Sequence, residues 1–307
     1  MKSLIARLLC AAAILAAAPL WADEKPALEL VVLGSGGPGA VGRAASGYLV
    51  LLDGVPRILV DAGPGTFTRL GEAGLSLART DIVLLTHLHA DHVGELPGLF
   101  KARAVSSGGP ITFRVFGPDG RKGRKDDATF PSISRFMHLL FDQQGAFGYL
   151  RDFSAPMTIQ PTDIATGKGA ARVLLSEDGL TIRATPGHHR DAPAVIYRVD
   201  YAGKSITFTG DIDAAGWPHL RTLAQGSDVL VFNSVVLDPP GSPPVLYTLH
   251  TPPKAIGEIA RDMGVKQLVL SHLSPAVEKS RDAVNASIAR NYSGAVSFAS
   301  DGAHIVP

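Results

Sequence analysis

The sequence contains a single cysteine, Cys10, in 307 residues. One thiol cannot form an intrachain disulfide, a cysteine-based metal site or a redox pair, so any metal site must use His, Asp or Glu. An excess of charge is also lacking, because 29 Lys and Arg balance 28 Asp and Glu. This balance gives no electrostatic reason to expect a nucleic acid partner. The sequence has no repeat or low-complexity tract, which excludes a disordered chain, a collagen-like rod and a coiled coil.

The only long apolar run lies at the start of the chain. Lys2 and Arg7 precede an apolar stretch from Leu8 to Leu20, which the small residue Ala22 follows closely. This pattern is typical of a secretory signal peptide, and the stretch is short for a permanent membrane span. We expect residues 1–22 to be a cleaved signal peptide, leaving a periplasmic or secreted protein with no stable membrane anchor. An uncleaved N-terminal anchor is the alternative. Loss of the two basic residues would change the formal net charge from +1 to about −1.

The remaining chain alternates short β-rich runs with helical patterns. Apolar runs such as Asp81 to Leu85 are typical of strands buried on both faces. Asp53-Gly54 predicts a hairpin, and hairpins that precede crossovers imply mixed sheets covered by helices. No stretch is typical of a linker, so we predict one α/β domain over residues 23–307. The least regular segment, at about residues 117–166, is interpreted as an insertion that shapes the substrate pocket.

The strongest chemical signal is Thr86-His87-Leu88-His89-Ala90-Asp91-His92, directly after a predicted strand. A strand end presents side chains from a rigid sheet to a loop, so three imidazoles and a carboxylate converge there. His87 and His89 can bind one ion from the same side, while Asp91 and His92 can turn to a second. Imidazole and carboxylate groups are good zinc ligands, and two ions make a compact hydrolytic centre. The motif therefore predicts a metal site.

This motif resembles the His-x-His-x-Asp-His hallmark of the metallo-β-lactamase superfamily, and other motifs of that superfamily follow the same order. They are Ile58-Leu59-Val60-Asp61-Ala62-Gly63, Thr185-Pro186-Gly187-His188-His189, Thr207-Phe208-Thr209-Gly210-Asp211 and Leu268-Val269-Leu270-Ser271-His272. The resemblance covers nearly all of the chain from about Leu28. It implies the fold class, a metallo-β-lactamase-like αβ/βα four-layer sandwich in which helices flank two mixed sheets.

The resemblance also implies the ligands of two zinc ions, although such ligand sets can host iron or manganese as well. One ion would be held by His87, His89 and His189, the second by Asp91, His92 and His272, with Asp211 as the bridge. His188 competes with His189 for one position, and the resemblance favours His189 because a proline and a tyrosine follow at the spacing of related sequences. Asp61 would orient a ligand histidine from outside the site.

Within the superfamily the chain resembles the ribonuclease Z and arylsulfatase-like branch. The resemblance rests on Leu33-Gly34-Ser35-Gly36-Gly37-Pro38, on Arg43 and on Leu249-His250-Thr251-Pro252. In ribonuclease Z relatives a histidine at the His250 position can protonate the leaving oxygen, so His250 and Asp91 are the expected catalytic residues. Relatives often carry a glutamate where this chain has Asn233, which leaves the acid role of His250 open.

We therefore expect an exported binuclear metal-dependent hydrolase that cleaves a small ester with a metal-bridging hydroxide, an aryl sulfate or phosphodiester being favoured. The near-neutral charge and the lack of a long tRNA-gripping arm make nucleic acid an unexpected substrate. Three alternatives stay open: a lactonase that uses Tyr247 or Tyr149, a ribonuclease Z-like phosphodiesterase, and a catalytically inactive metal-binding protein. A homodimer is the default for this branch.

Overall fold

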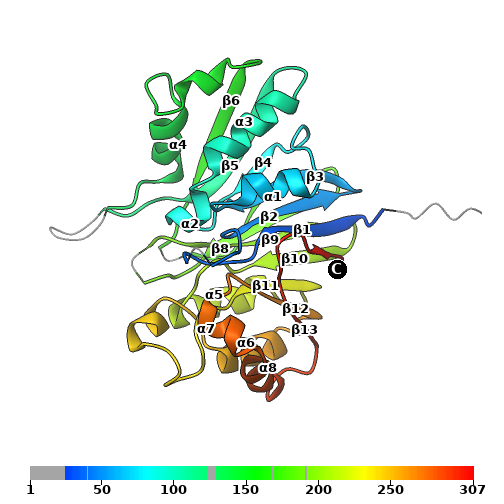
Figure 1. Ribbon diagram of the computed structural model, residues 1–307, viewed down its shortest axis with the longest axis vertical. Coiled ribbons are helices and arrows are strands. Elements are labelled where there is room, and N and C mark those ends of the chain that lie inside the picture. Colours follow the sequence, from blue (N-terminus) through cyan, green and yellow to red (C-terminus); the bar gives the residue numbers. More distant parts are fainter. Residues whose placement is uncertain (1–24, 40, 123–128, 168, 191) are drawn as a thin grey trace, which may run out of the picture.

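The described part of the computed structural model, residues 25–39, 41–122, 129–167, 169–190 and 192–307, forms two seven-stranded sheets (Figure 1). The first sheet, in spatial order, contains β14 (His304–Ile305), β1 (Leu28–Gly34), β2 (Gly47–Leu52), β3 (Val55–Ala62), β4 (Ile82–Leu84), β5 (Ile111–Pro118) and β6 (Met157–Ile164). The second contains β13 (Ala295–Phe298), β12 (Gln267–Ser271), β11 (Val229–Asn233), β10 (Lys204–Phe208), β9 (Val195–Tyr201), β8 (Leu180–Pro186) and β7 (Arg172–Glu177). The expected signal peptide, residues 1–22, lies outside the described residues.

Helices cover the outer face of each sheet. The helices that follow or lie between strands of the first sheet are α1 (Thr66–Glu72), α2 (Ala90–Val93), α3 (Leu96–Ser106) and α4 (Ile133–Phe141), with the 3-10 helix η1 (Gly148–Arg151). Those of the second half are α5 (Trp217–Leu223), α6 (Pro253–Asp262), α7 (Pro275–Lys279) and α8 (Arg281–Ala289), with η2 (Ala214–Gly216) and η3 (Pro244–Thr248). Figure 1 shows α1, α3 and α4 on one side of the two sheets and α5, α6 and α8 on the other.

The central strands are apolar on both faces because each sheet has a packed core on either side. In β1, Leu30 and Val32 belong to the core between the sheets, whereas Val31 and Leu33 pack in the core beneath the helices of the first half. Successive residues of a strand point to opposite faces, so a strand covered on both sides must be apolar throughout. This arrangement confirms the predicted αβ/βα four-layer sandwich.

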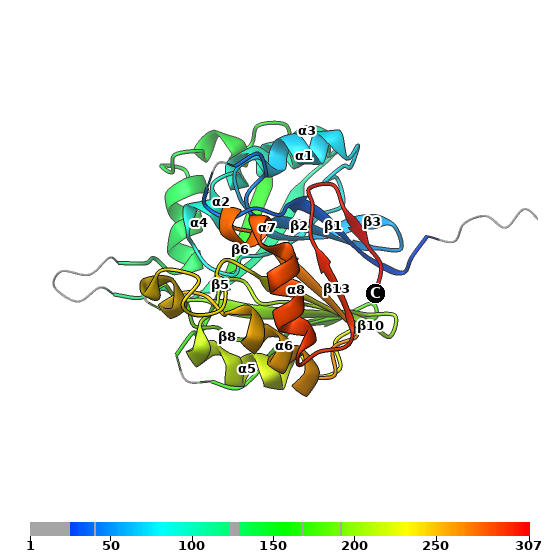
Figure 2. The same cartoon turned by 60° about the horizontal axis from the view of Figure 1, so that its bottom comes forward.

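Parallel strands bring one end of each sheet to the same edge of the molecule. Strands β3 to β6 pair in parallel, as do β10 to β13. The carboxyl ends of parallel strands meet at one edge, which is where open α/β sheets hold their ligands. After β13 the chain returns to the first sheet, where β14 pairs with β1 near the C-terminus (Figure 2).

Two local features differ from the sequence pattern. The irregular segment 117–166 contains β6, which pairs in parallel with β5. This segment therefore contributes the edge strand of the first sheet. The apolar periodicity of the sequence predicts one helix over Ala276 to Asn291, but the structure divides this stretch at Ser280, which ends α7 and begins α8. Within the described residues, no helix combines the length and apolar character needed to cross a membrane.

Candidate metal centre

The structure gathers the predicted ligands from the ends of four strands. Four follow β4: His87 and His89 in the loop, and Asp91 and His92 on α2. The others follow β8, β10 and β12, and His272 takes a left-handed backbone conformation with a φ of 53° directly after its strand. Asp61, at the end of β3, has a φ of 54°. Short polar side chains adopt this conformation more readily than bulky ones, which suits an aspartate at the turn out of a strand.

Two groups of three side chains have the spacing of metal ligands. The ligand atoms of the first group lie within 4.8 Å of one another, as do those of the second. The first group is His87, His89 and His189, and the second is Asp91, His92 and His272. These are the two ligand sets that the resemblance implied, and two further overlapping groups add Asp211 and His250.

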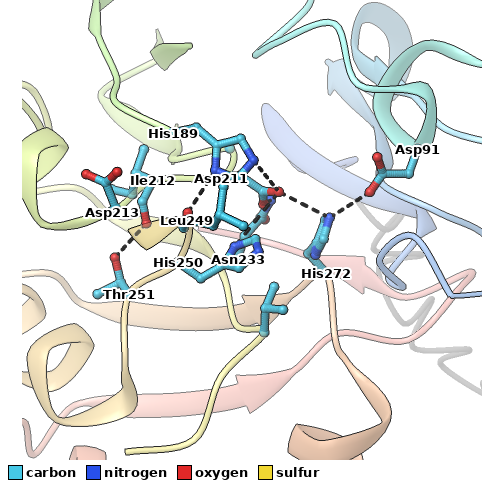
Figure 3. Close-up of polar contacts among 12 residues, drawn as sticks. Asp91, His189, Asp211, Ile212, Asp213, Asn233, Leu249, His250, Thr251 and His272 are labelled. Carbon is cyan, nitrogen blue, oxygen red and sulfur yellow. Dashed lines mark hydrogen bonds and ion pairs between the residues drawn. The ribbon is translucent and has the colours of Figure 1, made fainter. Parts of the chain in front are cut away.

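Asp211 lies between the two groups. Its Oδ2 atom is within 4.0 Å of a ring nitrogen of five histidines: 4.0 Å from His87, 3.8 Å from His92, 3.7 Å from His189, 3.9 Å from His250 and 3.5 Å from His272. Figure 3 shows His189 and His272 on either side of Asp211, with Asp91 beyond His272. One oxygen that faces both ligand groups is in the place that a bridging ligand requires.

Asn233 orients this carboxylate. Its Nδ2 atom donates a hydrogen bond of 2.7 Å to Oδ1 of Asp211, so Oδ2 is the oxygen left to face the histidines. The amide is buried at the end of β11, the strand next to β10. Asn233 therefore contacts the bridge position, a role that the sequence comparison with glutamate-bearing relatives did not reveal.

Asp61 fixes the ring of His92 from outside the ligand groups. Its Oδ2 accepts a 2.7 Å hydrogen bond from Nδ1 of His92, and its two oxygens also accept from the backbone N–H and the hydroxyl of Thr86, each at 2.8 Å. A protonated Nδ1 leaves the lone pair on Nε2, which points to Asp91 and Asp211. Sequence reasoning predicted the role of Asp61 but missed Thr86, which directly precedes the histidine motif.

His189, not His188, reaches the ligand cluster. Nδ1 of His189 donates to the carbonyl of Leu249 at 2.8 Å, which leaves Nε2 toward Asp211. The side chain of His188 is 47% exposed and its Nδ1 lies 2.7 Å from Asp213. The two neighbouring rings thus point to different surroundings. The structure thereby favours His189 as the ligand, a choice that the sequence alone left open.

The protonation states of His87 and Asp211 suit a divalent cation. Burial and then the charge of His92 hold the pKa of His87 well below its ordinary value. Burial opposes ionisation of Asp211, yet the charges of His272 and His250 hold its pKa well below the usual range. Neutral imidazole and ionised carboxylate are the forms that bind metal. Among the described residues, the buried Nε2 atoms of His87 and His92 have no hydrogen-bond partner. Buried polar atoms are normally paired, so these two nitrogens fit the role of metal ligands.

Two glycines let the backbone approach the ligands. A side chain at Gly37 would place Cβ 2.7 Å from Cε1 of His272, closer than any real contact. At Gly210, φ is +56° and a Cβ would lie 2.7 Å from Cβ of Thr86. Only glycine fits either position without displacing a residue of the site.

A cavity of about 380 Å³ opens onto the cluster. His250 lines it, and its Nδ1 has no hydrogen-bond partner among the described residues. Burial lowers the pKa of this imidazole to about 4, against the opposing charge of Asp211. Among the described residues, Asp211 is the one carboxylate within 4.0 Å of a ring nitrogen of His250, so no second carboxylate there holds a proton on this imidazole.

The two tyrosines considered for a lactonase lie elsewhere. The hydroxyl of Tyr247 donates to the carbonyl of Leu237 at 3.0 Å and accepts from the backbone N–H of Ser242, which closes a loop. Tyr149 is exposed and packs edge-on against Phe153. Neither tyrosine lines the cavity.

The segment 117–166 approaches the ligand cluster through one ring, but none of its described residues lines the cavity. The ring of Phe130 lies 5.9 Å from that of His89, and a backbone bridge pairs Phe130 with Arg121. Phe136, Phe141 and Phe147 pack with the outer core of the first sheet, whereas Tyr149 and Phe153 are exposed.

Fold and site together define a member of the beta-lactamase superfamily. A family model described as a beta-lactamase superfamily domain matches residues 56–273, and the chain belongs to this family. The predicted superfamily and the prediction of a metal-dependent hydrolase are thereby confirmed, and this fold implies a divalent metal.

Known relatives point to one branch. A ribonuclease Z of Mycobacterium avium is 29% identical over 285 residues, covering 89% of this chain and 96% of the relative. The short form of human tRNase Z superposes with a TM-score of 0.66 at 23% identity, covering 91% of this chain and 99% of that one. The metallo-beta-lactamase fold protein YhfI of Bacillus subtilis gives the same TM-score at 20% identity, with 92% and 99% covered. The likeness to ribonuclease Z supports the branch and weakens the expectation that nucleic acid is not a substrate.

Proposed function

We propose that the protein is a metal-dependent phosphodiesterase of the ribonuclease Z type. The observation that carries this proposal is the position of Asp211 Oδ2, within 4.0 Å of five histidine nitrogens and between two complete ligand groups. The sequence alone favoured an aryl sulfate and a phosphodiester equally. The curated relatives named ribonuclease Z favour the phosphodiester.

The metal ions are proposed to be two zinc ions, with iron or manganese as the alternatives for the same ligands. His87, His89 and His189 would hold one ion, and Asp91, His92 and His272 the other, with Asp211 between them. When bound, such ions supply Lewis acidity toward the phosphoryl oxygens and toward water.

Asp91 is the proposed proton acceptor. Its side chain is 15% exposed and lines the cavity, and its Oδ2 lies 3.1 Å from Nε2 of His272. Burial raises its pKa, but the hydrogen bond from His272 outweighs this and holds the pKa below the ordinary value, so the carboxylate is ionised at neutral pH. An ionised group at the cavity wall can take a proton from the attacking water and release it to solvent.

His250 is proposed to contact the substrate. It lines the cavity beside Asp211, which is the one carboxylate within 4.0 Å of its ring nitrogens in the described part of the chain. Because the amide of Asn233 donates to Asp211, the described residues provide no counterpart of the glutamate that accompanies this histidine in relatives. We therefore assign His250 to hydrogen bonding and orientation, and its role as an acid stays a prediction.

Hydrolysis of a substrate panel tests the proposal. The panel holds bis(4-nitrophenyl) phosphate, 4-nitrophenyl sulfate, a lactone and an RNA oligonucleotide, assayed with added zinc or manganese and with a chelator. Chelator-sensitive cleavage of a phosphodiester supports the proposal. Turnover of only the sulfate or the lactone would overturn it in favour of those alternatives.

The variant Asp91→Asn separates an enzyme from an inactive metal-binding protein. We expect this variant to lose turnover, while Asp262→Asn, which changes an exposed carboxylate paired with Arg261, keeps it. Absence of turnover in the metal-loaded wild type on every substrate, with two metals bound per chain, would favour the inactive metal-binding alternative.

Export is proposed separately. It is supported by the pattern of residues 1–22, which lie outside the described residues. Mass spectrometry of the full chain expressed in a bacterium with a periplasm tests it: a mature N-terminus at Asp23 is expected, and an intact leader on protein retained in the cytoplasm would refute export. The homodimer also stays a prediction, to be measured by light scattering.

A further inference from the structure

The cavity that opens onto the metal centre is lined by two kinds of side chain. The polar ones are the ligand groups, including Asp91 and Asp211. The apolar ones, here called the apolar wall, come from four separate stretches of the chain and are Pro38, Val41, Val235, Leu246, Leu249, Leu273 and Pro275. A cavity of about 380 Å³ that is mostly apolar, with a few convergent polar groups, has the character of a small-molecule site.

Cations are lacking in this cavity. None of the described residues that line it is Lys or Arg. Proteins that bind nucleic acid hold successive phosphates with Lys and Arg and stack bases on aromatic rings, and the lining contains neither cations nor Phe, Tyr or Trp. The described lining therefore offers a second phosphate no cationic partner and a nucleotide base no aromatic ring to stack on.

We propose that the apolar wall binds an aryl or branched alkyl ester group, so that the preferred substrates are small phosphodiesters with one apolar, non-leaving substituent. This inference rests on the proposed phosphodiesterase function and names its substrate class. In the reaction, the oxygen of water forms a new P–O bond and the P–O bond to the leaving alcohol or phenol breaks. One proton of water passes to a carboxylate of the site and from there to the leaving oxygen, or to solvent when a phenolate leaves, and the apolar group stays on the phosphomonoester product.

Two wall residues come from different elements and allow independent tests. Leu246 lies on η3 and is half-buried, whereas Val41 lies in the loop between β1 and β2 and is 48% exposed. An exposed valine on an active-site wall would be covered by an apolar substrate group. Val245, adjacent to Leu246 on η3, is 51% exposed and does not line the cavity, which makes it a matched control.

Three diesters with the same leaving group test the proposal. Phenyl 4-nitrophenyl phosphate, methyl 4-nitrophenyl phosphate and thymidine 5′-(4-nitrophenyl phosphate) all release 4-nitrophenolate, so they differ only in the group that would occupy the cavity. We expect kcat/KM of the metal-loaded full-length protein to be at least about tenfold higher for the phenyl ester than for the other two. Leu246→Ala and Val41→Ala should each reduce this preference several-fold, mainly by raising KM for the phenyl ester, whereas Val245→Ala should leave it unchanged.

The outcomes separate this inference from the proposed function. Hydrolysis of the three diesters with rates within twofold, or a preference for the nucleoside ester or for an RNA oligonucleotide, would overturn the apolar substrate class and leave the phosphodiesterase standing. The same holds if both wall variants lower kcat/KM equally for all three esters. Failure of the wild type to hydrolyse any phosphodiester would instead overturn the proposed function itself, and this inference with it.

Discussion

Replacing Asp61 by asparagine is expected to weaken metal binding without disturbing the backbone. Asparagine has the same shape as aspartate and tolerates the left-handed conformation that Asp61 adopts, with a φ of 54°. One end of the new side chain would carry an NH₂ group, although the oxygens of Asp61 now accept three hydrogen bonds from Thr86 and His92. A donor would then face a donor, unless the imidazole moves its proton from Nδ1 to Nε2. That change would block the lone pair that points into the site.

The expected magnitude follows from this loss of orientation. Changing a partner of a ligand histidine typically costs about 10- to 100-fold in metal affinity, which corresponds to about 1.4–2.7 kcal/mol. Competition for zinc against a chromogenic chelator measures this directly on the purified protein. The free energy of unfolding of the metal-free variant should fall by about 1–3 kcal/mol as well, because a buried donor loses its acceptor.

Asp228→Asn is the matched control. Asp228 is also a buried aspartate that accepts hydrogen bonds from a backbone N–H and a hydroxyl, both of Ser205, and from the ammonium of Lys266. It precedes β11, at the opposite end of the strand from the metal centre. This control should lose comparable stability and keep its zinc affinity. If Asp61→Asn binds zinc as the wild type does, or if the control weakens binding equally, the argument from the orientation of His92 fails.

Three further predictions concern the site and the fold. His189→Ala should lose at least one bound metal per chain, whereas His188→Ala should keep both, as measured by metal analysis after dialysis; equal metal loss would contradict the assignment of the ligand. Gly37→Ala should lower metal affinity because its Cβ would collide with a ligand ring, while Gly39→Ala, whose nearest neighbour would lie 3.7 Å from the new Cβ, should not; chelator competition decides between them. The pKa of Asp228 is held below its ordinary value of 3.8, since its lysine and serine partners outweigh the opposing effect of burial. Its carboxylate therefore stabilises the folded state above about pH 4, and this stabilisation is lost as the pH falls through the lowered pKa. Unfolding of wild type and Asp228→Asn at several pH values should show a stability difference that is constant near neutrality and shrinks in acid, and a constant difference throughout would refute the reasoning.

The hydrophobic pattern predicts mixed sheets covered by helices, and the family resemblance adds the four-layer arrangement. The pattern also predicts strands over Val229–Asn233 and Gln267–Ser271 with the bounds that the structure gives them, because in each a continuous apolar run stops at a polar residue. Strand β6, Met157–Ile164, was missed because an edge strand is half-exposed and contains a proline, Pro161, so its sequence lacks the signal of a buried strand. The division of the last helices at Ser280 was missed because the apolar periodicity continues through it.

The sequence by itself determined which residues converge at the candidate metal centre, because the histidine motif and the strand-ending aspartates are local patterns whose order matches a known family. Only the tertiary structure decided between His188 and His189, since neighbouring rings are equivalent in sequence and differ in what each strand end places beside them. The tertiary structure was also needed to show that Asn233 donates a hydrogen bond to Asp211. It likewise showed that Val41 and Leu246 line the same cavity. Such contacts join segments far apart in the chain, and their distances are set by the packing of two sheets rather than by any local pattern.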